Sequence, residues 1–215
     1  METHRLSLQT PEPSLAVASL AVELRARTAS LHGQVENMLG LPGAIRTRAD
    51  YASWLARFLG LYEPLERSLA TFPMWKASGF ELPSRSQSSR VAADLRALGT
   101  VPGNVPRAPP ALLPELPTFA HAVGVFYVLQ GARLGGRLIL RDIETRIGPE
   151  VSGATRFFGG QGDAAGPTWQ DVRVALDDFG REHPQRRDQV VSGAQRTFRT
   201  MLAWFAPFCV AAAAS

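Results

Sequence analysis

The segment spanning residues 118–147 limits the choice of fold more than any other part of the chain. It is apolar with helical periodicity, yet glycine interrupts it at Gly124, Gly131, Gly135 and Gly136. Each helical glycine costs roughly 1 kcal/mol relative to alanine, so this number of them indicates close packing or contact with a ligand. The sequence therefore predicts one long helix over 118–147 that kinks at its glycines.

Helical periodicity also dominates the rest of the chain. We expect a helix from Leu15 to Leu39 capped by Ser14, a second from a Thr47–Asp50 capping box, and others over 88–98, 167–179 and 184–208. Residues 101–117 contain six prolines and predict an extended connection. Strand-like alternation and Asn-Gly turns are absent, so we predict an all-α fold in a single domain over 14–208, between a flexible tail at 1–13 and a C-terminal tail at 209–215.

Composition excludes several classes of protein. The single cysteine, Cys209, excludes an internal disulfide framework and a zinc site built from several cysteines. Lys76 is the one lysine among 23 basic residues, and this arginine bias favours anionic ligands or an acidic partner, although a GC-rich genome produces the same bias. The sequence has no basic run interleaved with aromatics, so we do not expect it to bind nucleic acid. It also has no apolar run of membrane length and no signal peptide, so we expect a cytoplasmic protein that does not bind membrane.

His32 has suitable neighbours for a metal ligand. Thr28, His32 and Glu36 repeat at four-residue spacing and share one helix face, with Arg25 two turns before His32 on nearly the same line. An imidazole that binds a metal through one nitrogen usually donates a hydrogen bond from the other, and a nearby carboxylate can accept it. The alternative is a His–Glu pair on a solvated helix face. His121, at the start of the glycine-containing helix, is expected to face the core.

Gly131 and Gly135 lie one helical turn apart and leave a strip of helix without side chains. A flat ligand could lie against the backbone there. Close packing of two helices would use the same strip, so the glycines alone leave both interpretations open.

Taken together, these segments resemble the heme oxygenase family, in particular its bacterial members associated with bacteriophytochromes. The sequence His-Gly-Gln-Val-Glu-Asn at 32–37 is similar to the family's proximal-histidine helix, and Tyr-Val-Leu-Gln-Gly-Ala-Arg-Leu-Gly-Gly at 127–136 is similar to its kinked distal helix. Phe157–Gly160 with Trp169, and residues 193–198 with Trp204, extend the resemblance over roughly residues 15–206.

The resemblance implies an enzyme that opens heme with O2 and reducing equivalents, giving biliverdin, carbon monoxide and ferrous iron. Heme would be substrate and cofactor at once, held between the first helix and the glycine-containing helix. It also implies electrons from a ferredoxin, a flavodoxin or an NADPH-dependent reductase. A bacteriophytochrome is the partner that would receive the biliverdin.

Residue roles follow from the same resemblance. His32 would bind the iron, and Glu36 would steady the imidazole. Gly131 and Gly135 would act in catalysis, because they let the distal backbone approach the ring carbon that is attacked. The other implied heme contacts are Arg25, Thr28, Tyr127, Gly136 and Phe198.

The chain also departs from the family pattern. Gln130 stands where many relatives carry Glu, Gln161 where they carry Tyr, and Ala132 matches the distal Asp of the animal enzymes. Gln130 cannot act as an acid at neutral pH, so the proton relay has no assigned residue. A heme-binding or sensor protein without catalysis therefore remains an alternative, as does a helical interaction module that binds no heme.

Overall fold

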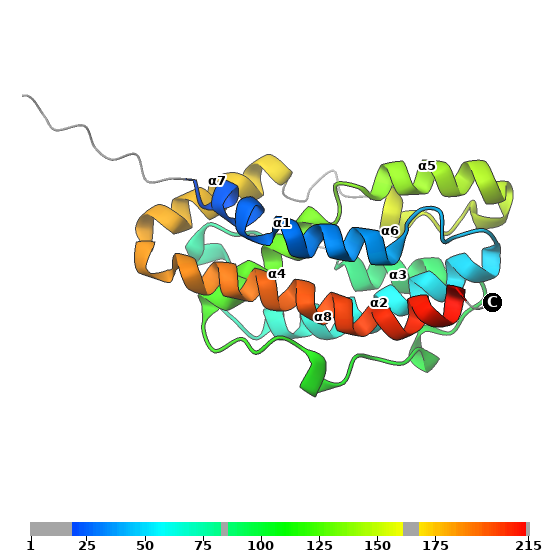
Figure 1. Ribbon diagram of the computed structural model, residues 1–215, viewed down its shortest axis with the longest axis horizontal. Coiled ribbons are helices and arrows are strands. Elements are labelled where there is room, and N and C mark those ends of the chain that lie inside the picture. Colours follow the sequence, from blue (N-terminus) through cyan, green and yellow to red (C-terminus); the bar gives the residue numbers. More distant parts are fainter. Residues whose placement is uncertain (1–18, 83–85, 161–167, 214–215) are drawn as a thin grey trace, which may run out of the picture.

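The computed structural model describes residues 19–82, 86–160 and 168–213, and the regular elements within these ranges are helical (Figure 1). The all-α prediction is thus confirmed, while the N-terminal tail at 1–13 lies outside the described residues. The α-helices are α1 (Leu20–Leu39), α2 (Arg48–Ala70), α3 (Gln87–Ala97), α4 (Phe119–Gly131), α5 (Gly136–Ile147), α6 (Arg156–Gly159), α7 (Trp169–Glu182) and α8 (Arg187–Ala213). Short 3-10 helices lie at Lys76–Ser78, Pro102–Asn104, Pro110–Leu112, Gly148–Val151 and Pro184–Arg186.

The long helix α8 holds the molecule together. It packs along both α1 and α4, and these are the most extensive helix–helix contacts of the fold (Figure 1). Helices α2 and α3 pack on each other, α7 lies at one end, and α5 with α6 lies at the other (Figure 1). Because α8 touches both α1 and α4, it fixes the position of one relative to the other.

Aromatic side chains fill the core between α2 and α8. The ring of Phe205 lies 6.0 Å from that of Trp54 and 5.1 Å from that of Phe58, measured between centroids. Tyr51 is fully buried, and its hydroxyl donates to the carbonyl oxygen of Ala154 at 2.7 Å. Burying one such side chain stabilises the fold by roughly 1.5–3 kcal/mol, so this cluster anchors α2 and α8 firmly.

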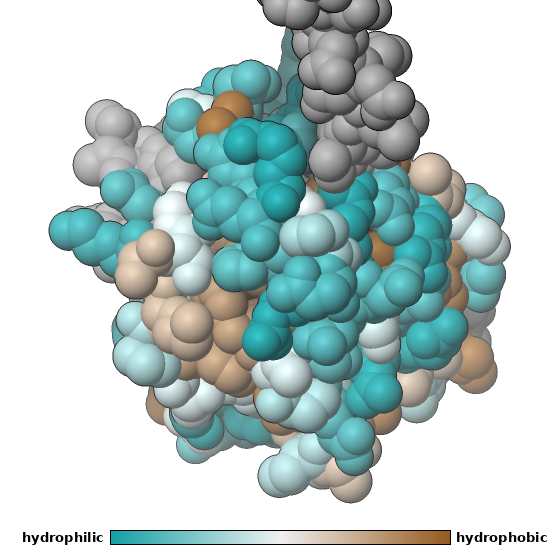
Figure 2. Space-filling view, turned by 90° about the vertical axis from the view of Figure 1, so that its left-hand side faces the viewer, coloured by the Kyte–Doolittle hydropathy of each residue, from teal (hydrophilic) through white to brown (hydrophobic). Residues whose placement is uncertain are grey.

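Seen from the end that carries α7, the surface is mostly hydrophilic, with apolar side chains in smaller areas (Figure 2). Among the described residues, no helix is both long and apolar enough to cross a membrane.

The first helix begins later than the sequence suggested. The side chain of Ser19 accepts a hydrogen bond from the Val22 amide at 3.1 Å, so Ser19 is the N-cap. The prediction of a cap at Ser14 is wrong in this respect, and Ser14 itself lies outside the described residues. At the other end Gly40, with φ 58°, adopts the left-handed conformation that glycine tolerates best and ends the helix.

Two capping boxes set the starts of α2 and α7. The box predicted at Thr47 and Asp50 is confirmed, since each side chain accepts from the other's backbone amide, at 3.0 Å and 2.9 Å. Thr168 and Asp171 make the same arrangement at α7, so that helix runs over Trp169–Glu182 instead of the predicted 167–179.

The predicted helix over 118–147 is two helices. Helix α4 ends at Gly131, α5 starts at Gly136, and a turn joins them. In this turn the amides of Arg133 and Leu134 bond to carbonyls three residues back, at 3.2 Å and 3.1 Å, which tightens the chain and interrupts the α-helical ladder. The prediction of a kink is therefore corrected to a full break.

The last helix is shifted toward the C-terminus. It starts at Arg187, after a single 3-10 turn at Pro184–Arg186, and continues to Ala213. The prediction of a tail from residue 209 is wrong for residues 209–213. Pro207 lacks an amide hydrogen and removes only one backbone bond, and the alanines that follow favour helix strongly.

Candidate functional site

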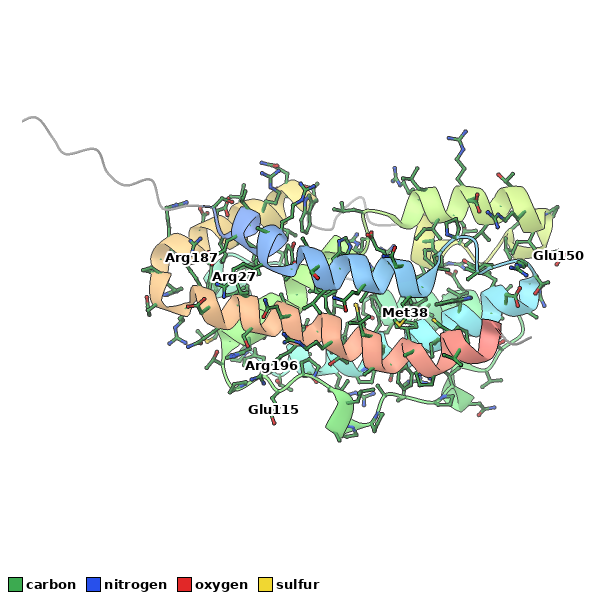
Figure 3. The ribbon with its side chains drawn as sticks, in the orientation of Figure 1. Arg27, Met38, Glu115, Glu150, Arg187 and Arg196 are labelled. Carbon is green, nitrogen blue, oxygen red and sulfur yellow. The ribbon has the colours of Figure 1, made fainter. Side chains whose placement is uncertain are left out.

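The first half of α1 is held firmly by ion pairs. The Glu23 carboxylate accepts hydrogen bonds from Arg187 at 2.6 Å and from Arg27 at 3.0 Å, and Arg27 also pairs with Asp188 at 2.6 Å. Arg27 and Arg187 lie together where α1 meets the start of α8 (Figure 3). Burial alone would raise the pKa of Glu23, but the two arginines outweigh it and lower that pKa. The carboxylate therefore stays ionised and fixes α1 on α8.

The second half of α1 carries the predicted ligand, His32, in an open position. Its side chain is 55% exposed, and Nε2 lies 3.4 Å from Oε1 of Glu36. The imidazole also contacts Phe198 of α8, with 5.5 Å between ring centroids. The structure thus brings His32, Glu36 and Phe198 together, and the exposed imidazole can be reached by a ligand.

No group of three or more His, Cys, Asp and Glu side chains suited to a metal ion occurs in the part of the chain that the structure describes. A metal at His32 would therefore take most of its ligands from a non-protein group. His121 is buried, with its Nδ1 2.9 Å from the Thr118 hydroxyl, and burial together with the charge of Arg196 lowers its pKa. Its position agrees with the expected core role.

Thr28 of α1 and Tyr127 of α4 lie near each other, one turn before His32. The Thr28 side chain is buried, and its hydroxyl donates to the carbonyl oxygen of Leu24 at 2.7 Å. Burial raises the pKa of Tyr127, while the nearby Thr28 hydroxyl and the positive charge of Arg25 act in the opposite direction. Arg25 itself is exposed. Three of the predicted heme contacts, Arg25, Thr28 and Tyr127, therefore lie together.

At two of the four glycines no backbone of another element packs against the chain. A Cβ added to Gly135 would meet no atom within 4 Å. One added to Gly131 would lie 3.6 Å from the Trp169 ring, an ordinary van der Waals distance. Neither residue is therefore required by helix packing.

The other two glycines are explained by packing. A Cβ on Gly124 would lie 2.1 Å from the carbonyl oxygen of Val190 in α8, and one on Gly136 would lie 2.6 Å from that of Phe158 in α6. These separations are impossible, so only glycine allows such close approaches. Gly136, predicted as a heme contact, faces α6 instead, and that prediction is corrected.

Trp169 is a residue whose position the sequence did not predict. Its indole covers Gly131, and its ring centroid lies 5.8 Å from that of Tyr127. The resemblance included Trp169 without giving it a role. The edge of the indole, with Cη2 and Cζ3 nearest, thus occupies the space beside Gly131.

The positions linked to the proton relay carry no acid. Gln130 is buried, and its Oε1 accepts a hydrogen bond from Arg133 at 2.8 Å. Ala132 is exposed in the turn between α4 and α5, and Gln161 lies outside the described residues.

No family model, curated protein or solved structure matches this chain. The functional assignment therefore depends on the geometry of the site and on the motifs in the sequence.

Proposed function

We propose that this chain is a heme oxygenase, which binds heme between α1 and the Gly131–Gly135 strip and opens it to biliverdin, carbon monoxide and ferrous iron. The observation that supports this most is that no backbone packs against Gly131 or Gly135, whereas the neighbouring Gly124 and Gly136 are explained by packing. Two glycines without a packing role, in the segment that contacts the histidine helix, favour a ligand as the reason for their presence.

The direction of the helices supports the placement. Both α1 and α4 run toward the end of the molecule that carries α5 (Figure 1). Thr28 lies near the Tyr127 hydroxyl, and one turn further along each helix lie His32 and Gly131. His32 and the glycine strip therefore both lie one turn beyond the place where Thr28 and Tyr127 come together. They can face one ligand from its two sides.

The residues present suit heme, a flat apolar ring system with two carboxylates. Gly135 offers backbone without a neighbouring side chain, Gly131 would offer the same once the Trp169 indole moves, and Phe198 next to His32 offers an apolar contact. Arg25 is exposed, carries a positive charge near the Tyr127 hydroxyl, and suits two-point contact with a carboxylate. Heme lying over Gly131 would have to displace the Trp169 indole, so we expect this side chain to move on binding.

Bound heme would supply the iron that activates O2 and the ring carbon that is oxidised. His32 would hold the iron, and Glu36 would accept a hydrogen bond from the imidazole and so fix its tautomer. The backbone at Gly131 and Gly135 would limit which edge of the ring lies near the distal side. Since Gln130 and Ala132 do not titrate, we expect water to deliver the protons.

The source of electrons and the fate of the product are inferred from the resemblance alone. We expect a ferredoxin, a flavodoxin or an NADPH-dependent reductase as donor, and a bacteriophytochrome as recipient of the biliverdin, in the cytoplasm.

The test is turnover of hemin by the purified protein with ascorbate and O2. We expect the Soret band to disappear, a biliverdin absorption to grow, and carbon monoxide to be released. His32→Ala should abolish turnover, whereas the matched control His183→Ala, at the other end of the molecule, should not. A stable heme spectrum would favour the non-catalytic heme-binding protein, and absence of hemin binding would favour the interaction module.

A further inference from the structure

Asp94 of α3 belongs to none of the motifs and is not among the residues assigned above to heme. Its side chain is fully buried, with an exposed fraction of 0%. Oδ1 accepts a hydrogen bond from the Arg156 amide at 3.0 Å, and Oδ2 accepts one from the Phe157 amide at 2.8 Å. Burying a carboxylate is costly, so we expect this one to fix a part of the structure that apolar side chains cannot fix.

The two amides belong to the first turn of α6, a helix of only four residues. Thr155, which precedes this helix, makes no capping hydrogen bond with its side chain, so the carboxylate from α3 satisfies the amides in its place. The Arg90 guanidinium of α3 also donates to the Arg156 carbonyl oxygen, at 3.4 Å. Helix α3 therefore holds α6 by its backbone.

The apolar side chains of α6 hold it in a less specific way. The rings of Phe157 and Phe158 lie 5.1 Å and 5.8 Å from that of Phe58 in the core, measured between centroids. These contacts keep α6 on the core, but the hydrophobic effect has no preferred direction. Hydrogen bonds are directional, so the two bonds to Asp94 fix how α6 is placed and rotated.

Helix α6 lies between α3 and α5 and contacts both (Figure 1). A Cβ added to Gly136 would lie 2.6 Å from the Phe158 carbonyl oxygen and 3.3 Å from the Phe158 Cα, so the two backbones touch at this point. Gly136 is the first residue of α5 and directly follows Gly135. A shift of α6 would therefore move the start of α5, and Gly135 with it.

We infer that Asp94 is a positioning residue. Through α6 it fixes the break between α4 and α5, and it thereby sets which ring carbon of heme the backbone at Gly135 leaves open to oxidation. The first part concerns the heme-free protein, and the second part rests on the proposed function. A misplacement of about 1 Å that originates far from the reacting atoms is enough to change a rate about a hundredfold.

The test is the ratio of biliverdin isomers formed from hemin, measured by liquid chromatography. Asp94→Asn leaves one amide of α6 without its acceptor, so we expect the ratio of the main isomer to the others to fall roughly tenfold. Gly136→Ala pushes on α6 from the other side and should also lower this ratio. Asp50→Asn is the matched control: it removes a carboxylate that accepts two backbone amides at the start of α2, and should change the ratio less than twofold.

Hydrogen exchange of the heme-free protein tests the first part alone. The amides of residues 136–143 in α5 should exchange roughly tenfold faster in Asp94→Asn than in the wild type, and at the wild-type rate in Asp50→Asn. All variants are compared well below their melting temperatures. If Asp94→Asn does not fold, the isomer ratio of Gly136→Ala decides.

Three results would overturn the inference. They are unchanged exchange in α5 of Asp94→Asn, an unchanged isomer ratio in Asp94→Asn or Gly136→Ala, and an equal change of the ratio in Asp50→Asn, which would point to a general loss of stability. Failure of the wild type to degrade hemin would instead contradict the proposed function, and the exchange rates would still decide whether Asp94 holds the start of α5.

Discussion

Gly124 and Gly136 lie against the backbones of α8 and α6, whereas Gly131 and Gly135, in the same stretch of chain, face a movable side chain or open space. In the sequence the four residues look alike, since each interrupts the same apolar helical pattern. In the structure the two pairs differ in the atoms that a methyl group added at each glycine would touch. The first pair allows helices to approach closely, and the second pair has no such packing role.

The largest effect on stability is expected from Gly124→Ala. The new methyl group would collide with the Val190 carbonyl and the Ala194 amide in α8, and backbone atoms cannot move aside cheaply. Overpacking of this kind costs about 3 kcal/mol, more than the helix propensity gained. Urea denaturation measures the loss, and an unchanged midpoint would show that α4 and α8 do not approach each other this closely.

Gly136→Ala should have a smaller effect of the same sign. Its methyl group would meet the Phe158 carbonyl oxygen, but α6 is one short turn and can shift more easily than α8. We expect a loss of about 1–2 kcal/mol in the same urea experiment. A loss equal to that of Gly124→Ala would mean that α6 is as rigid as α8.

Gly135→Ala should raise the free energy of unfolding while lowering hemin turnover. No atom lies near the new methyl group and the backbone is right-handed helical, so the protein should be stabilised by up to about 1 kcal/mol. Hemin turnover should nevertheless fall, roughly tenfold or more, because the distal backbone is kept from the ring. Parallel urea and turnover measurements check this, and normal turnover would remove Gly135 from the site.

The smallest effect on stability is expected from His32→Ala. The imidazole is more than half exposed, so the free energy of unfolding should change by no more than about 0.5 kcal/mol. Denaturation of the heme-free variant measures this. A large loss would indicate that His32 supports the fold instead of serving a ligand.

Much of the fold could be predicted because residues close together in the sequence decide where a helix forms and where it begins and ends. The Thr47–Asp50 box and the helix before Gly99 are examples, since each depends on neighbouring residues. The sequence predicts the start of α1 wrongly because Ser14 and Ser19 are both suitable caps. At α7 the proline at 167 predicts an earlier start than the one observed, although Thr168 and Asp171 repeat the box pattern of α2.

The site could be predicted only in part, because tertiary contacts decide the rest. Four-residue spacing placed His32 and Glu36 on one face of α1, and the resemblance suggested Tyr127 and Phe198. Residue spacing could not show that Gly136 faces α6 or that Trp169 covers Gly131. Both contacts depend on how α4 and α5 pack against α7 and α6, which are distant in the sequence.

The axial ligation of added hemin tests the central claim most directly. Electron paramagnetic resonance of the ferric complex should show one imidazole nitrogen bound to iron in the wild-type protein. His32→Ala should lose that signal, and free imidazole added to the variant should restore it. An unchanged spectrum in His32→Ala would contradict the account, because another residue would then bind the iron.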